Sequence, residues 1–186
     1  MTMRWILPGT VLEADPDRPT AAEEVFSSLF LGGGLVLSQV CRITGLEPYT
    51  VQNWVKRGFL APPVRKKYNR RQLCRILMIN MLKTALPMEA ICRLLSYVNG
   101  QLNDESDDTI DDSQLYLYFL RLAAGCRLEQ PLPRLDRELE AVLADYQEPC
   151  AGARDRIAGA LRVMVTAYLS SQFQKQAEEQ LQELGL

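Results

Sequence analysis

The chain has 186 residues, of which 47% are hydrophobic and 24% are charged, and its formal net charge of −2 is ordinary for a globular protein. It contains no run of about 18 apolar residues and no signal peptide at its start, so we expect a cytoplasmic protein that does not contact a membrane. It also contains no histidine, the commonest general base and metal ligand, so we expect neither an enzyme nor a bound cofactor.

The first 35 residues predict an N-terminal arm followed by a short helix. Prolines and scattered aspartates in residues 1–19 indicate irregular backbone. A capping-box spacing that begins at Thr20 predicts a helix that ends before three consecutive glycines at 32–34, which we interpret as a hinge. The glycines lack the motif of a phosphate-binding loop. We expect the arm to dock through its apolar residues, Trp5, Ile6 and Leu7.

Residues 36–100 begin with the pattern of two short helices. Ser38 is a candidate N-cap and Gly45 a candidate stop for the first helix. Pro48 suits the first turn of a second helix, which Gly58 closes. Two short helices joined by a tight turn that contains glycine form a helix-turn-helix. We therefore predict this motif at the start of a domain at 36–100.

The second helix has a polar face of the kind that reads DNA. Val51, Trp54 and Val55 fall at spacings i, i+3 and i+4, so they pack inward. Hydroxyl and amide groups can read base edges in the major groove, Arg57 can bond guanine, and lysine can neutralise phosphate. A face that is merely solvated is the alternative. The predicted DNA contacts of this recognition helix are Tyr49, Thr50, Gln52, Asn53, Lys56 and Arg57.

A strongly basic segment follows the second helix. Pro62 and Pro63 lead into seven residues that hold five cations and one tyrosine, and Asn69 is placed to cap the next helix. Residues 38–100 carry eleven Lys and Arg against two acids, whereas the rest of the chain carries ten against twenty-one. A patch that serves solubility alone usually mixes both signs. We therefore predict a wing that contacts phosphate through Arg65, Lys66, Lys67, Tyr68, Arg70 and Arg71.

The remaining chain predicts more helices and no strand of any length, hence an all-α fold. Two further helices, within 70–82 and 87–98, support the reading head through their apolar faces. Residues 101–112 carry six acids and indicate a solvated linker. Residues 113–186 predict a helical domain, with a last helix from about 153 to 184 whose second half keeps few apolar residues.

Five cysteines occur without any CxxC spacing, so neither a disulfide framework nor a metal site is indicated. We expect most of them to be buried free thiols. A redox or metal sensor built from Cys126 and Cys150 is the alternative.

The stretches LSQVCRITGLEPYTVQNWVKRGFL, KKYNRRQLCRILMI and LPMEAICRLL resemble the DNA-binding domain of the MerR family, over about a third of the chain. We also expect the chain to belong to an uncharacterised bacterial family of MerR-like regulators. The resemblance implies a winged helix-turn-helix with residues 48–57 as recognition helix and phosphate contacts at Lys66, Lys67 and Tyr68. Three features depart from the family: Asn53–Trp54 replaces its paired tyrosines, Pro62–Pro63 replaces a glycine in the wing, and the acidic linker displaces its long dimer helix.

These features favour a dimeric, sequence-specific transcription regulator that binds double-stranded DNA. Two heads about 34 Å apart reach successive major grooves, and we expect the dimer interface at residues 173–184. A protein-interaction adaptor that uses the same basic face is the alternative. A small-molecule effector is a further possible partner, although core packing is the commoner role of the aromatic residues that such a pocket would use: Tyr116, Tyr118, Phe119, Tyr146 and Tyr168.

Overall fold

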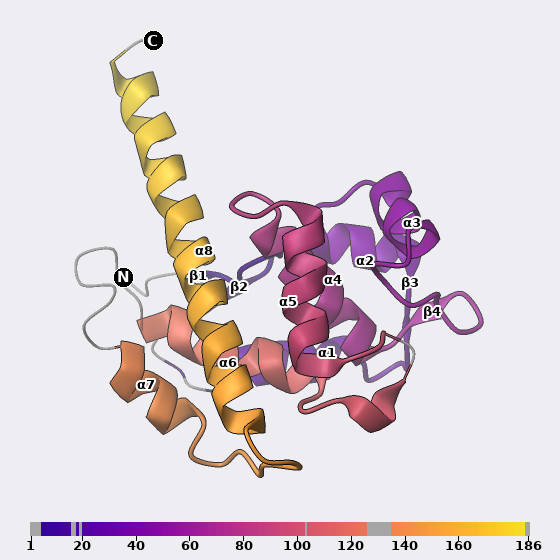
Figure 1. The fold of residues 1–186 in the computed structure, drawn as a ribbon. Coiled ribbons are helices and arrows are strands. Elements are labelled where there is room, and N and C mark those ends of the chain that lie inside the picture. Colours follow the sequence, from indigo (N-terminus) through magenta and orange to yellow (C-terminus); the bar gives the residue numbers. More distant parts are fainter. Residues whose placement is uncertain (1–4, 16–17, 19, 103, 126–134, 185–186) are drawn as a thin grey trace.

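The computed structural model describes residues 5–15, 18, 20–102, 104–125 and 135–184, and this part of the chain is mostly helical, as predicted (Figure 1). Its strands form two antiparallel pairs, β1 (Trp5–Ile6) with β2 (Glu13–Ala14) and β3 (Leu35–Val36) with β4 (Lys67–Tyr68). Each strand has two residues, too few for the alternation by which a sequence predicts strands. The absence of strand alternation in the sequence is therefore compatible with these short pairs, and the fold is mainly helical.

The N-terminal hairpin docks on the body through Trp5 and Leu7, as predicted, whereas Ile6 is 56% exposed. Leu7 is fully buried, and the Trp5 indole N–H lies 3.4 Å from the Tyr168 hydroxyl. The Tyr116 hydroxyl donates to the Pro8 carbonyl oxygen at 2.6 Å. Helix α1 (Ala21–Leu29) follows, but the Thr20 hydroxyl donates to the Glu24 carboxylate instead of capping the helix.

Helices α2 (Leu37–Thr44) and α3 (Pro48–Lys56) follow the predicted pattern. Gly45 ends α2 with φ of +70°, which an L side chain rarely adopts. The N-cap of α2 is Val36 and not Ser38, because the side chain of Gln39 accepts a hydrogen bond from the Val36 N–H at 2.9 Å. Residue Pro48 occupies the first turn of α3, as predicted.

Helix α4 (Arg70–Leu82) is the central element. Asn69 caps it by accepting a hydrogen bond from the Gln72 N–H at 2.8 Å, as predicted. It packs against α2, α5 (Met88–Asn99), α6 (Asp112–Gly125) and α8 (Ala153–Glu183). Because neighbours surround it, every residue from 72 to 79 is buried.

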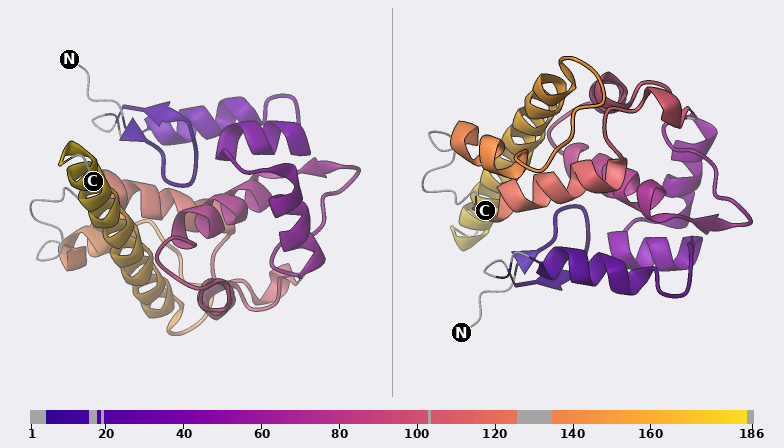
Figure 2. Two further views of the ribbon diagram at one scale, coloured as in Figure 1. Left: turned by 90° about the horizontal axis from the view of Figure 1, so that it is seen from above. Right: turned by 90° about the horizontal axis from the view of Figure 1, so that it is seen from below.

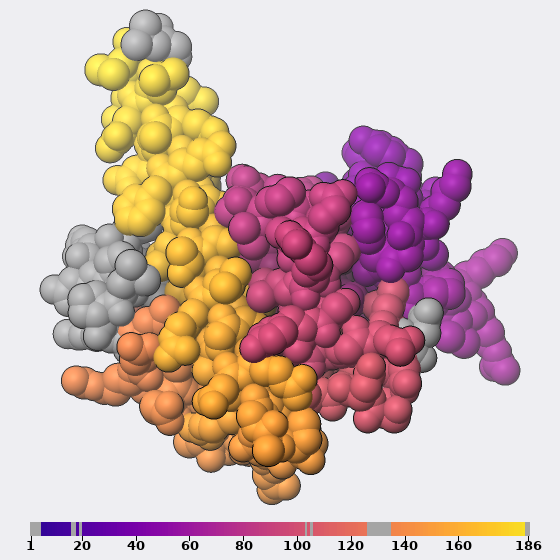
Figure 3. All heavy atoms as spheres, viewed as in Figure 1, coloured from indigo at the N-terminus to yellow at the C-terminus, as the bar shows by residue number. Residues whose placement is uncertain are grey.

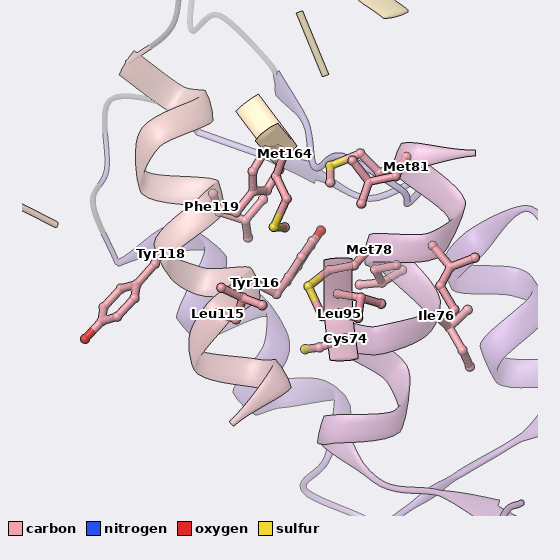
Figure 4. Close-up of a cluster of buried hydrophobic side chains, with 14 of the residues drawn as sticks. Cys74, Ile76, Met78, Met81, Leu95, Leu115, Tyr116, Tyr118, Phe119 and Met164 are labelled. Carbon is pink, nitrogen blue, oxygen red and sulfur yellow. The ribbon is translucent and has the colours of Figure 1, made fainter. Parts of the chain in front are cut away.

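One hydrophobic core runs through residues 36–100, hereafter the head, and the C-terminal helices. It contains residues of α4, α5, α6 and α8, including Met78, Leu95, Phe119 and Met164 (Figure 4). Tyr116, Tyr118 and Phe119 are each at most 1% exposed, so these aromatic rings fill the core. The Tyr146 hydroxyl donates to the Thr109 carbonyl oxygen, and its ring packs on the same core with α7 (Leu135–Val142).

Residues 101–112, hereafter the acidic segment, differ from the solvated linker that their composition predicts. They include a short 3₁₀ helix, η1 (Glu105–Asp107), and the first residue of α6. Thr109, Ile110 and Asp112 are each at most 5% exposed. The segment folds back onto the head because arginines of α4 attract its carboxylates, as detailed below.

Helix α8 leaves the core and continues alone. From Phe173 to residue 184 every residue is exposed, and this part, hereafter the C-terminal rod, projects from the body (Figures 1 and 3). The two views of Figure 2 place α8 and the β4 hairpin at opposite ends of the molecule. Among the described residues no helix is both long and apolar enough to cross a membrane.

The cysteines are free thiols where they are described. Cys74 is buried, and burial raises the pKa of its thiol well above the ordinary range. Cys41 and Cys92 are half-buried and Cys150 is exposed, so burial is less general than predicted. Cys126, one half of the predicted sensor, lies outside the described residues.

Candidate nucleic-acid interface

The outward face of α3 is polar and its inward face is apolar. Val51 and Trp54 are buried at 0% and 4% exposure, and Val55 is half-buried. Thr50 is half-buried, and the side chains that the sequence placed outward are otherwise exposed: Tyr49, Gln52, Asn53, Lys56 and Arg57. The helix therefore presents amides, hydroxyls and cations to solvent.

A tight hairpin, hereafter the wing hairpin (residues 64–67), presents three cations. The Lys67 N–H donates to the Val64 carbonyl oxygen at 2.9 Å, which closes a loop of two residues. Those two residues, Arg65 and Lys66, have φ of 49° and 63°. Two consecutive positive φ values are typical of a type I′ turn, for which Asn-Gly is the favoured sequence. An L side chain in this backbone conformation costs roughly 1–2 kcal/mol per residue. Arg65 and Lys66 therefore occupy the tip of the hairpin although its backbone favours asparagine and glycine.

The base of the wing is fixed by β-pairing and by a close backbone approach. Strand β4 pairs with β3, so that Leu35 opposes Tyr68. At Gly34 an added Cβ would lie 2.9 Å from the Lys67 Cβ and 3.0 Å from the Tyr68 carbonyl oxygen. At least one residue of the glycine triplet is therefore required by packing against the wing and not by a hinge.

Tyr68 does not lie where the sequence analysis placed it. Its side chain is 3% exposed and belongs to the hydrophobic core, and burial raises the pKa of its hydroxyl. Alternation along β4 turns this ring inward while its neighbour Lys67 points to solvent. We therefore correct its role from phosphate contact to anchor of the wing.

Gln72 connects the wing to α4 and was missed by the sequence analysis. Its side-chain N–H groups donate to the carbonyl oxygens of Ala61 and Pro62 at 3.1 and 2.9 Å. Its side-chain oxygen accepts from the Asn69 N–H at 2.9 Å, which completes a capping box. The Asn69-x-x-Gln72 spacing was the available signal, but nothing in the sequence places Ala61 and Pro62 beside it.

Arg57 is held in place at the end of α3. Its guanidinium carbon lies 4.6 Å from the centroid of the Phe59 ring, and one of its nitrogens lies 3.9 Å from a carboxylate oxygen of Glu89 on α5. The side chain stays 52% exposed. The Phe59 ring and the weak ion pair with Glu89 thus hold the Arg57 guanidinium in one orientation.

Arg71 faces the acidic segment and not open solvent. Its side chain is 17% exposed, it forms a close ion pair with Asp108, and its Nε lies 3.9 Å from an oxygen of Asp112. Arg70 is half-buried, with its Nε buried and without a hydrogen-bond partner. The phosphate contact predicted for Arg71 is therefore not offered by this conformation, because its guanidinium faces Asp108 and Asp112.

Arg75 and Asn99 complete this charged cluster, and neither was predicted. Arg75 is 5% exposed; it donates to the Phe59 carbonyl oxygen at 3.2 Å and to Asp112 at 3.3 Å. The Asn99 amide donates to the other oxygen of Asp112 at 2.7 Å. Burial raises the pKa of the Asp108 and Asp112 carboxyls, against the attraction of the arginines. The cluster connects the head, α5 and α6.

Among the predicted contact residues, the cations that remain exposed lie on one side of the molecule. Figure 3 shows the wing projecting from the body on the side where α3 lies. Lys56, Arg65, Lys66 and Lys67 form no ion pair with any residue that the structure describes. With the outward face of α3 they form what we call the basic face. Within the described ranges no group of three or more cysteine, aspartate and glutamate side chains is placed to hold a metal.

Comparison with known proteins gives two matches of limited extent. A family model described as "Domain of unknown function (DUF1836)" matches residues 35–119, from β3 into α6, and so covers the acidic segment as well as the head. An "Uncharacterized protein YkrK" of Bacillus subtilis (strain 168) is 32% identical over 84 residues, 43% of this chain. The chain covers 36% of that relative's length. No solved structure matches at a significant level.

Proposed function

We propose that the chain binds duplex DNA through a MerR-like winged helix-turn-helix and acts as a transcription regulator. The observation that carries this proposal is the basic face, in which the polar side of α3 and an unpaired cationic hairpin lie on the same side. The pairing of β3 with β4 supports it, because it fixes a basic β-hairpin beside a helix-turn-helix.

In this proposal α3 enters the major groove. The N-terminal residues of a recognition helix contact base edges, so Tyr49, Thr50, Gln52 and Asn53 are the proposed reading residues. Amide groups such as those of Gln52 and Asn53 bond adenine in two places. Arg57 lies at the C-terminal end of α3, against Phe59 and near Glu89. We therefore assign it to the phosphates that flank the read bases and not to a base.

The wing hairpin contacts phosphates alongside. Arg65, Lys66 and Lys67 are exposed and carry charge without an acidic partner among the described residues. Residues in strained backbone conformations are concentrated at functional sites, and the two positive φ values lie where cations are presented. Each cation that neutralises a phosphate releases a counterion, so binding depends on salt.

A second copy of the chain is the proposed partner of the C-terminal rod. Phe173, Ala177 and Leu181 recur at four-residue spacing, and Phe173 and Leu181 are 47% and 53% exposed. An isolated helix shorter than about 12–15 residues is marginal in water, so pairing of two rods explains a helix that extends beyond its own core. Because the rod lies at the far end from the wing, pairing leaves the basic face free.

Salt-titrated binding tests the proposal. Fluorescence anisotropy with a labelled mixed-sequence duplex of about 30 base pairs is measured for the full chain across a range of salt. Three to five phosphate contacts predict that the logarithm of affinity falls against the logarithm of salt with a slope of about −3 to −5. No binding, or a slope near zero, would reject DNA binding and favour an adaptor that binds an acidic protein.

A further inference from the structure

The contact between Arg71 and Asp108 separates one cation from the basic face. Arg71 lies in the first turn of α4, directly after the wing strand β4, yet its side chain is only 17% exposed. The Asp108 side chain that holds it is 9% exposed. An arginine at this position of the wing would otherwise reach the same phosphate backbone as Lys67.

This contact is incompletely satisfied. The Oδ1 atom of Asp108 and the Nε atom of Arg70 are both buried without a hydrogen-bond partner. A buried polar atom without a partner is unfavourable compared with the same atom in water. Opening the contact would expose the Asp108 Oδ1 atom to water, so Asp108 can be displaced at lower cost than a fully bonded carboxylate. Asp112 differs, since both of its oxygens accept hydrogen bonds, from Arg75 and from Asn99.

Other carboxylates of the acidic segment are exposed, unlike that of Asp112. Asp104, Asp107 and Asp111 are exposed in the same stretch that carries Asp108. Carboxylates near bound DNA repel its phosphates. The two ends of the segment are also unequal: Asp112 starts α6 inside the core, whereas Asp104, Ser106 and Asp107 are exposed. Asp108 thus follows exposed residues and directly precedes the buried Thr109.

We propose that the acidic segment is an intramolecular competitor of DNA: Asp108 occupies Arg71 in the free protein, and a DNA phosphate takes its place in the complex. This inference rests on the proposed function and adds a contact within the chain that competes with DNA binding. The segment lowers affinity for weakly bound duplexes, because each binding event must first displace Asp108. The contact between Asp112 and Arg75 stays in place when Asp108 is displaced.

Two variants that remove the same charge test the competitor. Asp108→Asn removes a carboxylate that pairs with Arg71, whereas Asp107→Asn removes a neighbouring exposed carboxylate that accepts a hydrogen bond from the Gln101 N–H. Both are measured as full chains with the mixed-sequence duplex across a range of salt. Asp108→Asn is expected to bind several-fold more tightly than the unmodified chain with the same salt slope, because Arg71 contacts a phosphate in both complexes and only the displacement of Asp108 is removed. Asp107→Asn is expected to change the affinity much less.

Equal affinities of the two variants would overturn the competitor, while absence of binding in every protein would instead reject the proposed function. Hydrogen exchange of the unmodified chain gives an answer even if Asp108→Asn fails to fold. Addition of the duplex is expected to speed exchange of the amides in residues 104–109 while it slows exchange in α3. Slower or unchanged exchange in 104–109, with protection of α3, would contradict displacement of Asp108.

Discussion

The side-chain amide of Gln72 donates to the carbonyl oxygen of Pro62 at 2.9 Å, so that the first turn of α4 holds the residues that lead into the wing. The same amide also bonds Ala61, and its oxygen completes the cap of α4. One buried side chain thus sets the position of the segment before the wing hairpin relative to α4.

Gln72→Met keeps the length of this side chain and removes its hydrogen bonds. We expect the free energy of unfolding to fall by about 1–3 kcal/mol, because the Asn69 N–H and two carbonyl oxygens lose a partner. We also expect weaker DNA binding, since the wing is no longer held. Urea denaturation and anisotropy measure the two effects. Gln147→Met, at an exposed position between α7 and α8, is the matched control and should change stability by no more than about 0.5 kcal/mol. Equal stability of both variants would show that Gln72 does not support the wing.

Replacement of the wing tip should separate stability from binding. Asn-Gly suits a type I′ turn, so Arg65→Asn with Lys66→Gly is expected to stabilise the chain by about 1 kcal/mol. The same double change removes two phosphate contacts and should reduce the magnitude of the salt slope by about 1.8.

The control for the wing tip is Arg65→Gln with Lys66→Gln, which removes both charges and keeps the strained backbone. It should weaken binding equally without the gain in stability. If the Asn-Gly variant bound DNA as well as the unmodified chain, the wing would not be a phosphate contact.

The pH dependence of stability should be unusually simple, because the chain has no histidine. Burial raises the pKa of Asp108 and Asp112, so on acidification the folded state takes up protons before the unfolded state does. Their contribution to stability is therefore present at low pH and lost as pH rises through the folded-state pKa values. We expect the free energy of unfolding to increase as the pH is lowered from neutrality toward the ordinary carboxyl range.

Urea denaturation at several pH values measures this trend, and Asp108→Asn should reduce it. The range stays above the pH at which Asp104 titrates, since hydrogen bonds from Ser106 lower the pKa of that carboxyl. A decrease of stability over the same range would contradict the assignment.

The C-terminal rod should control the oligomeric state. Phe173→Glu places a charge in the apolar stripe and should convert the dimer to a monomer, while the buried core, which ends before this residue, keeps its melting temperature. Gln182→Glu adds the same charge away from that stripe and should leave the dimer intact. Sedimentation equilibrium distinguishes the two. An unmodified chain that is monomeric at high concentration would exclude the rod as interface.

Local signals in the sequence were sufficient to predict three of the helix ends in the head. Gly45, Pro48 and Asn69 each act within a few residues, and each occupies the predicted place at a helix end. The inward and outward sides of α3 follow from helical periodicity for the same reason.

The contacts that the sequence analysis missed connect residues far apart in the chain. Asp112 pairs with Arg75 across 37 positions, and the acidic composition around it predicts a solvated segment because composition carries no information on pairing. Tyr68 was assigned to DNA because its neighbours are basic, yet a strand of two residues was enough to turn its ring inward. Tertiary pairing and burial, which depend on the whole fold, decided both cases.

Selection of bound sequences from a random duplex pool tests the central claim most directly. If α3 reads bases in each of two paired heads, the full chain will enrich a palindrome whose half-sites lie about 10 base pairs apart, centre to centre. Asn53→Ala should then lose selectivity at the base position that Asn53 reads, whereas Lys67→Ala should weaken binding at every sequence. A pool that stays random after repeated selection, or variants with identical effects, would contradict a sequence-reading function for α3.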